Sequence, residues 1–289
     1  MIKMKFPSVF QSSVTDDENA VEFGGLKWKG LDVIKGRDVV RYPANYEDLA
    51  YFYPLVVRMV EVKLNRDLGD RIAITVPTDL AKNKDYTDLL KTRIAKYTGK
   101  LADVYPQGVY ALLAGLKRGG LITNTLIIDG GFNTVNVAVV QAGLDGLDVL
   151  FMRTYTGEGI KSLLGLFYEK AKKKVLNLPS NEALLKEVFL KGQMSSGVTL
   201  YNLKEEKREA ITVYMGVLVN RIKSELSSIN AFYDQIMICG GLAYYVNLQG
   251  EGIRVVYGDE YSNAEGVFEH SRKPTIDFGF GDVKVVLPE

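Results

Sequence analysis

The stretch from Leu126 to Val140, LIIDGGFNTVNVAVV, predicts a strand, a tight turn and a second strand. Gly130 and Gly131 permit φ values and a close backbone approach that a side chain would block. Such a turn directs several N–H groups at one place, which suits a phosphate. Asp129, at the end of the first strand, suits a hydrated divalent cation instead. Taken alone, the segment is equally compatible with an ordinary β-hairpin that has a glycine turn.

A second segment, near the end of the chain, repeats this chemistry. Thr275 to Val286, TIDFGFGDVKVV, places Asp277 at the end of a strand, and Gly279 and Gly281 in the turn that follows. Lys284 comes next, in the second strand. The chain therefore carries two hairpins in which an acid precedes a glycine turn.

Two further junctions complement the hairpins. Gly240-Gly241-Leu242-Ala243 follows the apolar strand Gln235–Cys239 and offers a close-approach surface for a flat ring or a ribose. Tyr105-Pro106-Gln107-Gly108 joins a strand to a helix and places an amide side chain at the mouth of that junction. Both junctions lie where a strand ends, which is where ligands bind in open α/β folds.

Composition limits the classes of function. The 289 residues are 47% apolar and 25% charged, enough for one large core or two domains, and the net charge of +1 indicates no general affinity for polyanions. The one cysteine, Cys239, excludes an internal disulfide, and the one histidine, His270, excludes a His-rich metal site. No apolar run approaches about 18 residues and no signal peptide opens the chain, so we expect a soluble, cytoplasmic protein.

Strands and helices alternate along the chain in two rounds, each with its own strand-then-glycine turn. This pattern predicts two α/β domains that face a shared cleft. Strands are predicted at Ile2–Phe10, Val21–Phe23, Leu26–Trp28 and onward to Val40, Ile72–Val76, Leu101–Tyr105, Leu200–Leu203 and Gln235–Cys239. Helices are predicted at Asn45–Leu64 (bent or interrupted by Pro54), Lys84–Thr98, Val109–Leu116, Gly159–Val175 and Lys204–Ser228.

Together these segments resemble the actin, Hsp70 and sugar kinase superfamily, and most closely the ParM-like plasmid-segregation actins and their archaeal relatives. The resemblance covers most of the chain. It matches Asp277-x-Gly279-(four)-Lys284 to the first phosphate loop and Asp129-x-Gly131-x-x-Thr134 to the second. It also matches Pro106-Gln107-Gly108 and Ser262-Asn263-Ala264-Glu265-Gly266 to the two connecting segments, Gly240-Gly241-Leu242 to the adenosine motif, and Thr154–Gly159 to the loop after the second domain's first strands. Asn136 departs from the pattern, because many relatives carry a second acid there.

The order of the motifs also departs from the family. The first phosphate loop opens the chain in the family, but here it closes it, and Met1 begins where the family's third strand should follow. The resemblance therefore implies two actin-like (ribonuclease H-like) domains around a nucleotide cleft, circularly permuted. The expected domains are residues 1–122 plus 263–289, and residues 123–262. The second strand of the terminal hairpin should pair with Ile2–Phe10, which brings Met1 close to Glu289.

The resemblance also implies the ligands and the residues that hold them. We expect ATP, with GTP as the alternative nucleotide, and Mg²⁺ held by Asp129 and Asp277 largely through water. These two acids and Gln107, which would orient the attacking water, are the expected catalytic residues. The expected nucleotide-binding residues are Gly130, Gly131, Phe132, Asn133, Thr134, Gly157, Gly240, Gly241, Leu242, Gly279, Phe280, Gly281 and Lys284.

The resulting hypothesis is an ATPase that polymerises with ATP and hydrolyses it slowly, for plasmid segregation or another cytoskeletal role. Its partners would be further copies of the chain and a DNA-binding adaptor, with no direct contact to nucleic acid. A small-molecule kinase of the same superfamily is one alternative, but it needs an acid near the second phosphate loop, where Asn136 stands. A membrane-linked scaffold of division or pilus type is the other, but it needs an amphipathic anchor, which neither terminus offers.

Overall fold

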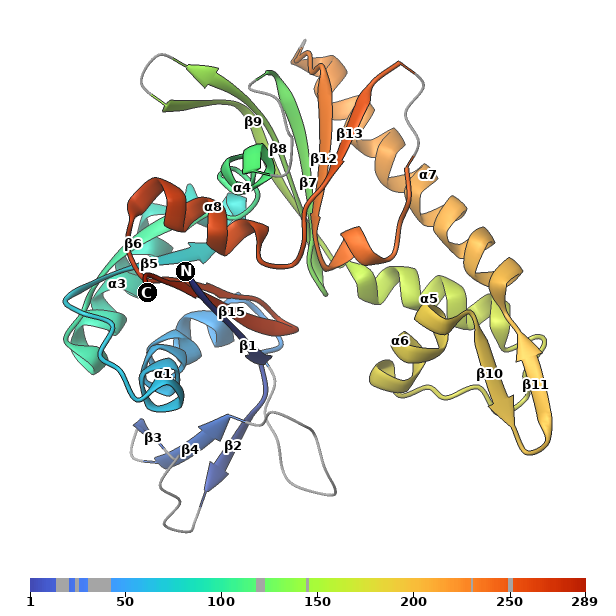
Figure 1. Cartoon of the computed structure of the whole chain (residues 1–289), viewed down its shortest axis with the longest axis horizontal. Coiled ribbons are helices and arrows are strands. Elements are labelled where there is room, and N and C mark those ends of the chain that lie inside the picture. The colour runs from blue at the N-terminus through green and yellow to red at the C-terminus, as the bar shows by residue number, and fades with distance from the viewer. Residues whose placement is uncertain are drawn as a thin grey trace.

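The computed structural model describes residues 1–13, 21–23, 26–30, 43–117, 123–143, 146–229, 231–248 and 252–289. Two five-stranded sheets organise these residues (Figure 1). The strand predicted to extend toward Val40 enters residues 31–42, which lie outside the described part. Among the described residues, no helix combines the length and the apolar character needed to cross a membrane.

One sheet, here the terminal sheet, contains both ends of the chain. Its strands, in spatial order, are β1 (Ile2–Pro7), β15 (Asp282–Leu287), β14 (Thr275–Phe278), β5 (Arg71–Val76) and β6 (Leu101–Pro106). The hairpin β14–β15 docks between β1 and β5, antiparallel to the first and parallel to the second. The Met1 amino group lies 2.5 Å from Glu289 Oε1, so the termini meet as the sequence predicted.

The other sheet, here the internal sheet, comes from the middle of the chain. Its strands, in spatial order, are β9 (Gly146–Thr156), β8 (Thr134–Gly143), β7 (Thr125–Gly130), β12 (Gln235–Gly240) and β13 (Arg254–Tyr257). Two antiparallel pairings are followed by two parallel ones, as in the terminal sheet. The two sheets thus share one design, with β14 and β15 in the places of β7 and β8. The circular permutation would give this chain order, and it stays a prediction.

Each sheet has its own hydrophobic core. Helices α1 (Tyr46–Leu64) and α3 (Lys84–Thr98) pack against the terminal sheet, and α1 runs on through Pro54, capped by Asn45 and Asn65. Helices α5 (Ile160–Ala171) and α7 (Lys204–Ser228) pack against the internal sheet, and α6 (Glu182–Lys191) packs on α5 and contributes to the same core. The remaining helices are α2 (Thr78–Ala81), α4 (Ala111–Lys117), α8 (Ser262–Ser271) and the 3₁₀ turn η1 (Gly241–Tyr244).

Two smaller sheets extend the molecule. Strands β2 (Phe10–Ser13), β3 (Val21–Phe23) and β4 (Leu26–Gly30) form one, and β10 (Gln193–Ser196) and β11 (Thr199–Asn202) the other. The prediction of one strand over Ile2–Phe10 is wrong, because β1 ends at Pro7 and β2 begins in a different sheet. Pro7 has no N–H for a sheet hydrogen bond. The N–H of Ser8, one residue further on, donates to Gly281 O at 3.0 Å.

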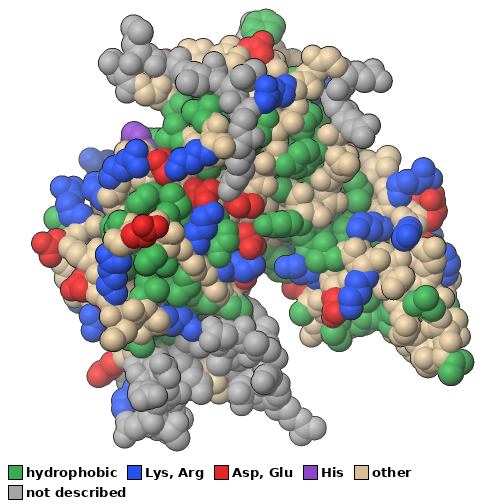
Figure 2. All heavy atoms as spheres, in the orientation of Figure 1, with side chains coloured by type: hydrophobic (Ala, Val, Ile, Leu, Met, Phe, Trp, Pro, Cys, Tyr) green, Lys and Arg blue, Asp and Glu red, His purple; other side chains and the backbone are tan. Residues whose placement is uncertain are grey.

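Figure 2 shows the notch between the body that holds the terminal sheet and the body that holds α6. Acidic and basic side chains gather at the head of this notch, where the two bodies meet. Helices α4 and α8 cross there at close range. A Cβ at Gly266 would lie 1.8 Å from the carbonyl oxygen of Tyr110, so only glycine permits this crossing.

Candidate nucleotide site

The two acids predicted from the hairpins face the same space and are both nearly fully buried. Asp277 is the next-to-last residue of β14 and is 3% exposed, and Asp129 is the next-to-last residue of β7 and is 4% exposed. Asp277 Oδ1 accepts hydrogen bonds from Thr75 Oγ1 at 2.5 Å and from Gln107 Nε2 at 2.8 Å. Asp129 Oδ2 accepts from Asn263 Nδ2 at 2.7 Å and from Asn136 Nδ2 at 3.4 Å.

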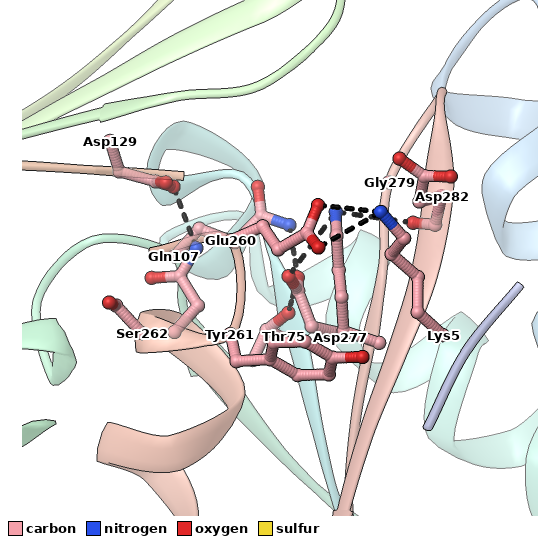
Figure 3. Close-up of polar contacts among 12 residues, drawn as sticks. Lys5, Thr75, Gln107, Asp129, Glu260, Tyr261, Ser262, Asp277, Gly279 and Asp282 are labelled. Atoms are coloured by element: carbon pink, nitrogen blue, oxygen red, sulfur yellow. Dashed lines mark hydrogen bonds and ion pairs between the residues drawn. The ribbon is translucent and has the colours of Figure 1, made fainter. Parts of the chain in front are cut away.

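Gln107 connects the two sheets. Its amide nitrogen donates to Asp277, and its carbonyl oxygen accepts from Asn136 Nδ2 at 3.0 Å. Next to it, the N–H of Gly108 donates to Asn263 Oδ1 at 2.6 Å. Gln107 directly follows β6, and its side chain is buried with 6% of the residue exposed. A continuous hydrogen-bond network therefore joins Asp277, Gln107, Asn136 and Asp129. Asp277, Gln107 and Asp129 are labelled in Figure 3.

The network orients its amides through hydroxyl and backbone groups of both bodies. Thr154 Oγ1 donates to Asn136 Oδ1 at 2.9 Å, and the N–H of Thr78 reaches the same oxygen at 3.4 Å. The hydroxyls of Thr78 and Thr154 lie 2.8 Å apart. Because the Asn136 oxygen is engaged by donors, its nitrogen is left to donate to Gln107 and Asp129. An ionised acid at position 136 has no N–H group, so it could not donate these two hydrogen bonds.

Burial and the nearby charge of Asp277 raise the pKa of Asp129 to about 6. The amide donors of Asn263 and Asn136 act in the opposite direction but do not outweigh burial. The nearest lysine to Asp277 is Lys284, with Nζ 4.0 Å from Oδ2. Two ionised carboxylates that face the same buried space repel each other, and a bound divalent cation would offset this repulsion. Among the described residues, no group of three or more His, Cys, Asp and Glu side chains is placed to hold a metal ion.

The two hairpin turns lie close together. A Cβ at Gly281 would be 3.1 Å from the Cβ of Phe132, so the tip of one turn contacts the other. Phe280 packs near Tyr46, with ring centroids 5.7 Å apart. The N–H of Gly131 bonds within its own turn to Thr134 O at 2.8 Å. Asn133 O accepts from the N–H of Gly157 at 2.7 Å, which fastens the Thr154–Gly159 loop to the internal turn.

The glycines after β12 serve close packing beside Asp129. Gly240 has φ +70°, and a Cβ there would lie 2.4 Å from Asp129 Oδ1. Leu242 is fully buried, and a Cβ at Gly130 would lie 2.2 Å from the Cβ of Leu242. The Leu242 side chain is therefore engaged in packing against Gly130 and is not presented to a ligand. The structure brings Gly240 and Gly241 to the acid, as expected of a motif at this strand end.

Sequence reasoning missed several members of the network. Thr75, Thr78 and Thr154 received no individual role, and Asn263 was noted only as part of a connecting segment. Sheet register is the signal that places Thr75 and Thr154: Asp277 pairs with Thr75, Asp129 with Asn136, and Asn136 with Thr154. Cys239 is buried, and its Sγ lies 3.8 Å from Asp129 Oδ1.

No protein-family model matches the sequence, and no curated protein matches it either. Solved structures do match. A ParM filament protein from Clostridium botulinum is 15% identical with a TM-score of 0.67, and an archaeal actin homologue in complex with ADP is 15% identical with a TM-score of 0.66. MreB5 of Spiroplasma citri bound to AMPPNP is 14% identical with a TM-score of 0.66.

These matches extend over nearly whole chains. Each covers 92% of this chain, and 92%, 92% and 89% of the respective structures. The chain therefore has the actin-like fold, with two α/β domains and a five-stranded sheet in each. The fold class predicted from the motifs is confirmed, while the domain boundaries and the individual site residues stay predictions.

Proposed function

We propose that this protein binds ATP and Mg²⁺ in the space between its two sheets, polymerises in the nucleotide-bound state and hydrolyses ATP slowly. The observation that supports this best is the convergence of the two hairpins. Two acids, one from each sheet, are buried within one hydrogen-bond network, with Gln107 between them. The solved neighbours include complexes with ADP and AMPPNP and a filament, which fits the same reading.

The residues present fit a magnesium nucleotide. Asp129 and Asp277 would hold Mg²⁺ mainly through water, because this ion keeps most of its hydration shell. Lys284 and the backbone N–H groups of both turns would bind the phosphates, and the backbone at Gly240 to Leu242 would lie against the adenosine. Bound Mg²⁺ would supply positive charge to the phosphates, which is the usual role of the metal in phosphoryl transfer.

Gln107 would orient the attacking water. An amide is not a base at neutral pH, so its contribution comes from position alone and is modest. The hydrogen bond from Asn136 and the one to Asp277 fix the plane of this amide. Hydrolysis should therefore be slow until assembly or domain closure completes the arrangement, so the bound nucleotide would act as a timer for the polymer.

The cellular role follows as a hypothesis from the same fold. A cytoplasmic filament that moves plasmid or other DNA through an adaptor protein, or that serves another cytoskeletal purpose, fits a nucleotide-timed polymer. A membrane-linked scaffold and a small-molecule kinase are the competing roles. The neutral Asn136 beside Asp129 disfavours the kinase, because the acid that would deprotonate a hydroxyl is not there.

Light scattering and pelleting after addition of Mg²⁺ and ATP test the proposal. We expect scattering to rise with ATP, to decay as phosphate is released, and to stay flat with EDTA or with the Asp277→Ala variant. Nucleotide binding without any assembly would contradict the filament. Assembly that requires lipid vesicles would favour the scaffold, and phosphate transfer to an added hydroxyl compound instead of water would favour the kinase.

A further inference from the structure

Two lysines face each other across neighbouring strands of the terminal sheet. Lys5 of β1 lies directly opposite Lys284 of β15, and Lys284 lies opposite Asp277 of β14. Directly opposed residues of antiparallel strands project from the same face. Lys5 is therefore on the face of the sheet that carries Asp277, while its neighbour Phe6 packs into the hydrophobic core on the other face.

Like charges placed directly opposite one another on two strands are destabilising unless an anion compensates them. Each lysine has an acidic partner: Lys284 approaches Asp277 at 4.0 Å, and Lys5 Nζ lies 2.9 and 2.8 Å from the two oxygens of Glu260. Glu260 belongs to the segment between β13 and α8. The Glu260 hydrogen bond and the charge of Asp282 outweigh the effect of burial, so the pKa of Lys5 is raised.

The strand that carries Lys5 is fastened to the turn of the terminal hairpin. Three residues along, Ser8 Oγ donates to Gly279 O at 2.6 Å and Ser8 N donates to Gly281 O at 3.0 Å. Figure 3 shows Lys5, Glu260, Gly279 and Asp282 gathered beside this turn. The Lys5 ammonium is thus held next to a turn whose backbone N–H groups suit a phosphate.

The partner of Lys5 can be exchanged at little cost. The side chain of Lys5 is 36% exposed and that of Glu260 is 20% exposed. Partly exposed ion pairs of this kind contribute little to stability, because water screens them and two long side chains must be ordered. A phosphate carries more charge than one carboxylate, so it would compete effectively for the same ammonium.

We propose that Lys5 is a second phosphate-binding cation of the cleft, which pairs with Glu260 while the site is free of nucleotide and with the terminal phosphate of a bound nucleoside triphosphate. Lys5 and Lys284 then form a pair of cations on adjacent strands that the triphosphate bridges. Glu260 is a competitor for Lys5 rather than a ligand of the nucleotide. This inference rests on the proposed function, because it requires that the cleft bind a nucleotide.

Lys3 supplies a matched control. It lies on the same strand and the same face, and its ammonium also pairs with an acid, Glu265 of α8. It stands opposite Val286 instead of Lys284, and it lies 5.3 Å over the ring of Tyr261. Lys3→Gln and Lys5→Gln therefore both remove a lysine from β1, but only Lys5→Gln removes the cation beside Lys284.

The test is a set of calorimetric affinities for ATP and ADP with Mg²⁺, measured on the whole chain and on Lys3→Gln, Lys5→Gln, Glu260→Gln and the Lys5→Gln/Glu260→Gln double variant. We expect Lys5→Gln to weaken ATP binding about tenfold, the size of one charge-assisted hydrogen bond, and ADP binding less. Lys3→Gln should stay within about twofold of the unmodified chain. Glu260→Gln should bind ATP as tightly or more tightly, and the double variant should resemble Lys5→Gln.

The directions in which Lys5→Gln and Glu260→Gln change the ATP affinity show whether Lys5 binds phosphate or only forms a structural ion pair with Glu260. If Glu260→Gln weakens ATP binding as much as Lys5→Gln does, the pair is a structural clamp and the inference is wrong. It is also wrong if Lys5→Gln binds ATP like the unmodified chain. If the unmodified chain itself binds neither nucleotide, the proposed function fails, and the inference fails with it.

Discussion

The terminal sheet and the internal sheet have the same strand order and the same acid-ending hairpin, but they differ in what stands beside the acid. In the terminal sheet, the row through Asp277 continues to Lys284 and Lys5. In the internal sheet, the corresponding row through Asp129 continues to Asn136 and Thr154. One hairpin thus presents cations and the other presents neutral hydrogen-bonding groups. The sheets have similar backbones and different chemistry, so the cleft between them is electrostatically asymmetric.

This asymmetry indicates a division of labour. The cationic row suits a phosphate anion, whereas the amide and hydroxyl row suits orientation of Gln107 and of water. The sheets differ in chain order as well, since the terminal sheet takes its hairpin from the end of the chain and its edge strand from the beginning. The chemistry of each row depends on which strands are neighbours in space, and not on their order along the chain.

The strongest test of the equivalence of the two hairpins is to remove each acid. Asp129→Ala and Asp277→Ala should each reduce Mg²⁺-dependent nucleotide binding or turnover by about 100-fold or more, because each hairpin supplies half of the metal site. The measurements are ATP affinity with and without EDTA, and phosphate release. Near-normal ATPase activity in either variant would show that only one hairpin takes part. Similar thermal unfolding of both variants is the control for folding.

The second prediction concerns the pH dependence that belongs to Asp129 alone. Its pKa of about 6 in the folded protein lies above the ordinary value of 3.8, so the folded state holds more protons between these pH values. The free energy of unfolding should then fall by roughly 2 kcal/mol as pH rises from 4 to 7, apart from other groups. In Asp129→Asn this contribution should vanish. Urea unfolding at several pH values measures it, and an unchanged slope in the variant would count against the assignment.

The same titration should affect the metal site. Mg²⁺ binds the ionised carboxylate, so the affinity for Mg²⁺–ATP should weaken as pH falls below about 6. Binding that is independent of pH between 5 and 7.5 would mean that Asp129 does not contribute to the metal site. Measurement of ADP binding without metal at the same pH values separates this effect from protonation of the nucleotide.

The third prediction concerns the link between the two rows. Gln107→Ala should keep nucleotide affinity but slow hydrolysis about tenfold, because in the proposed mechanism the amide would orient water and would not bind the ground-state phosphate. Filaments should consequently persist longer after ATP addition. Single-turnover phosphate release, combined with equilibrium binding, measures both parts. If affinity falls while the rate per bound ATP is unchanged, Gln107 only joins β6 to α4 structurally.

The smallest effect is expected from a change in chain order. A rearranged chain that begins at Lys273, joins Glu289 to Met1 through a short flexible linker and ends at Arg272 restores the order of the internal sheet. Because Met1 already contacts Glu289, its ATP affinity should stay within a few-fold of the original. Calorimetry and circular dichroism test this. A chain that folds but binds no nucleotide would show that the free ends matter to the site, contrary to a simple circular permutation.

Local sequence signals predicted some elements well. The boundaries of α3 and α7 agree with the predicted ranges, because an apolar stripe or a polar first turn marks each helix within one local segment. Strand β9 and helix α6 were not predicted. The pairing of β9 with β8 is interrupted by a bulge between Val139 and Val140 of β8. The exposed residues of β9 do not alternate regularly, which weakens the period-two pattern that predicts a strand.

The sequence alone determined that two hairpins would each place an acid before a glycine turn, since turn chemistry depends on adjacent residues. It also determined that Gln107 would stand at a strand end, and that the terminal hairpin would pair with the first strand. Tertiary structure alone decided that Asn136 donates to Gln107, and that Lys5 stands opposite Lys284 beside Glu260. These contacts join residues that are far apart in the chain, and sheet register, which fixes which side chains share a face, exists only once the strands have paired.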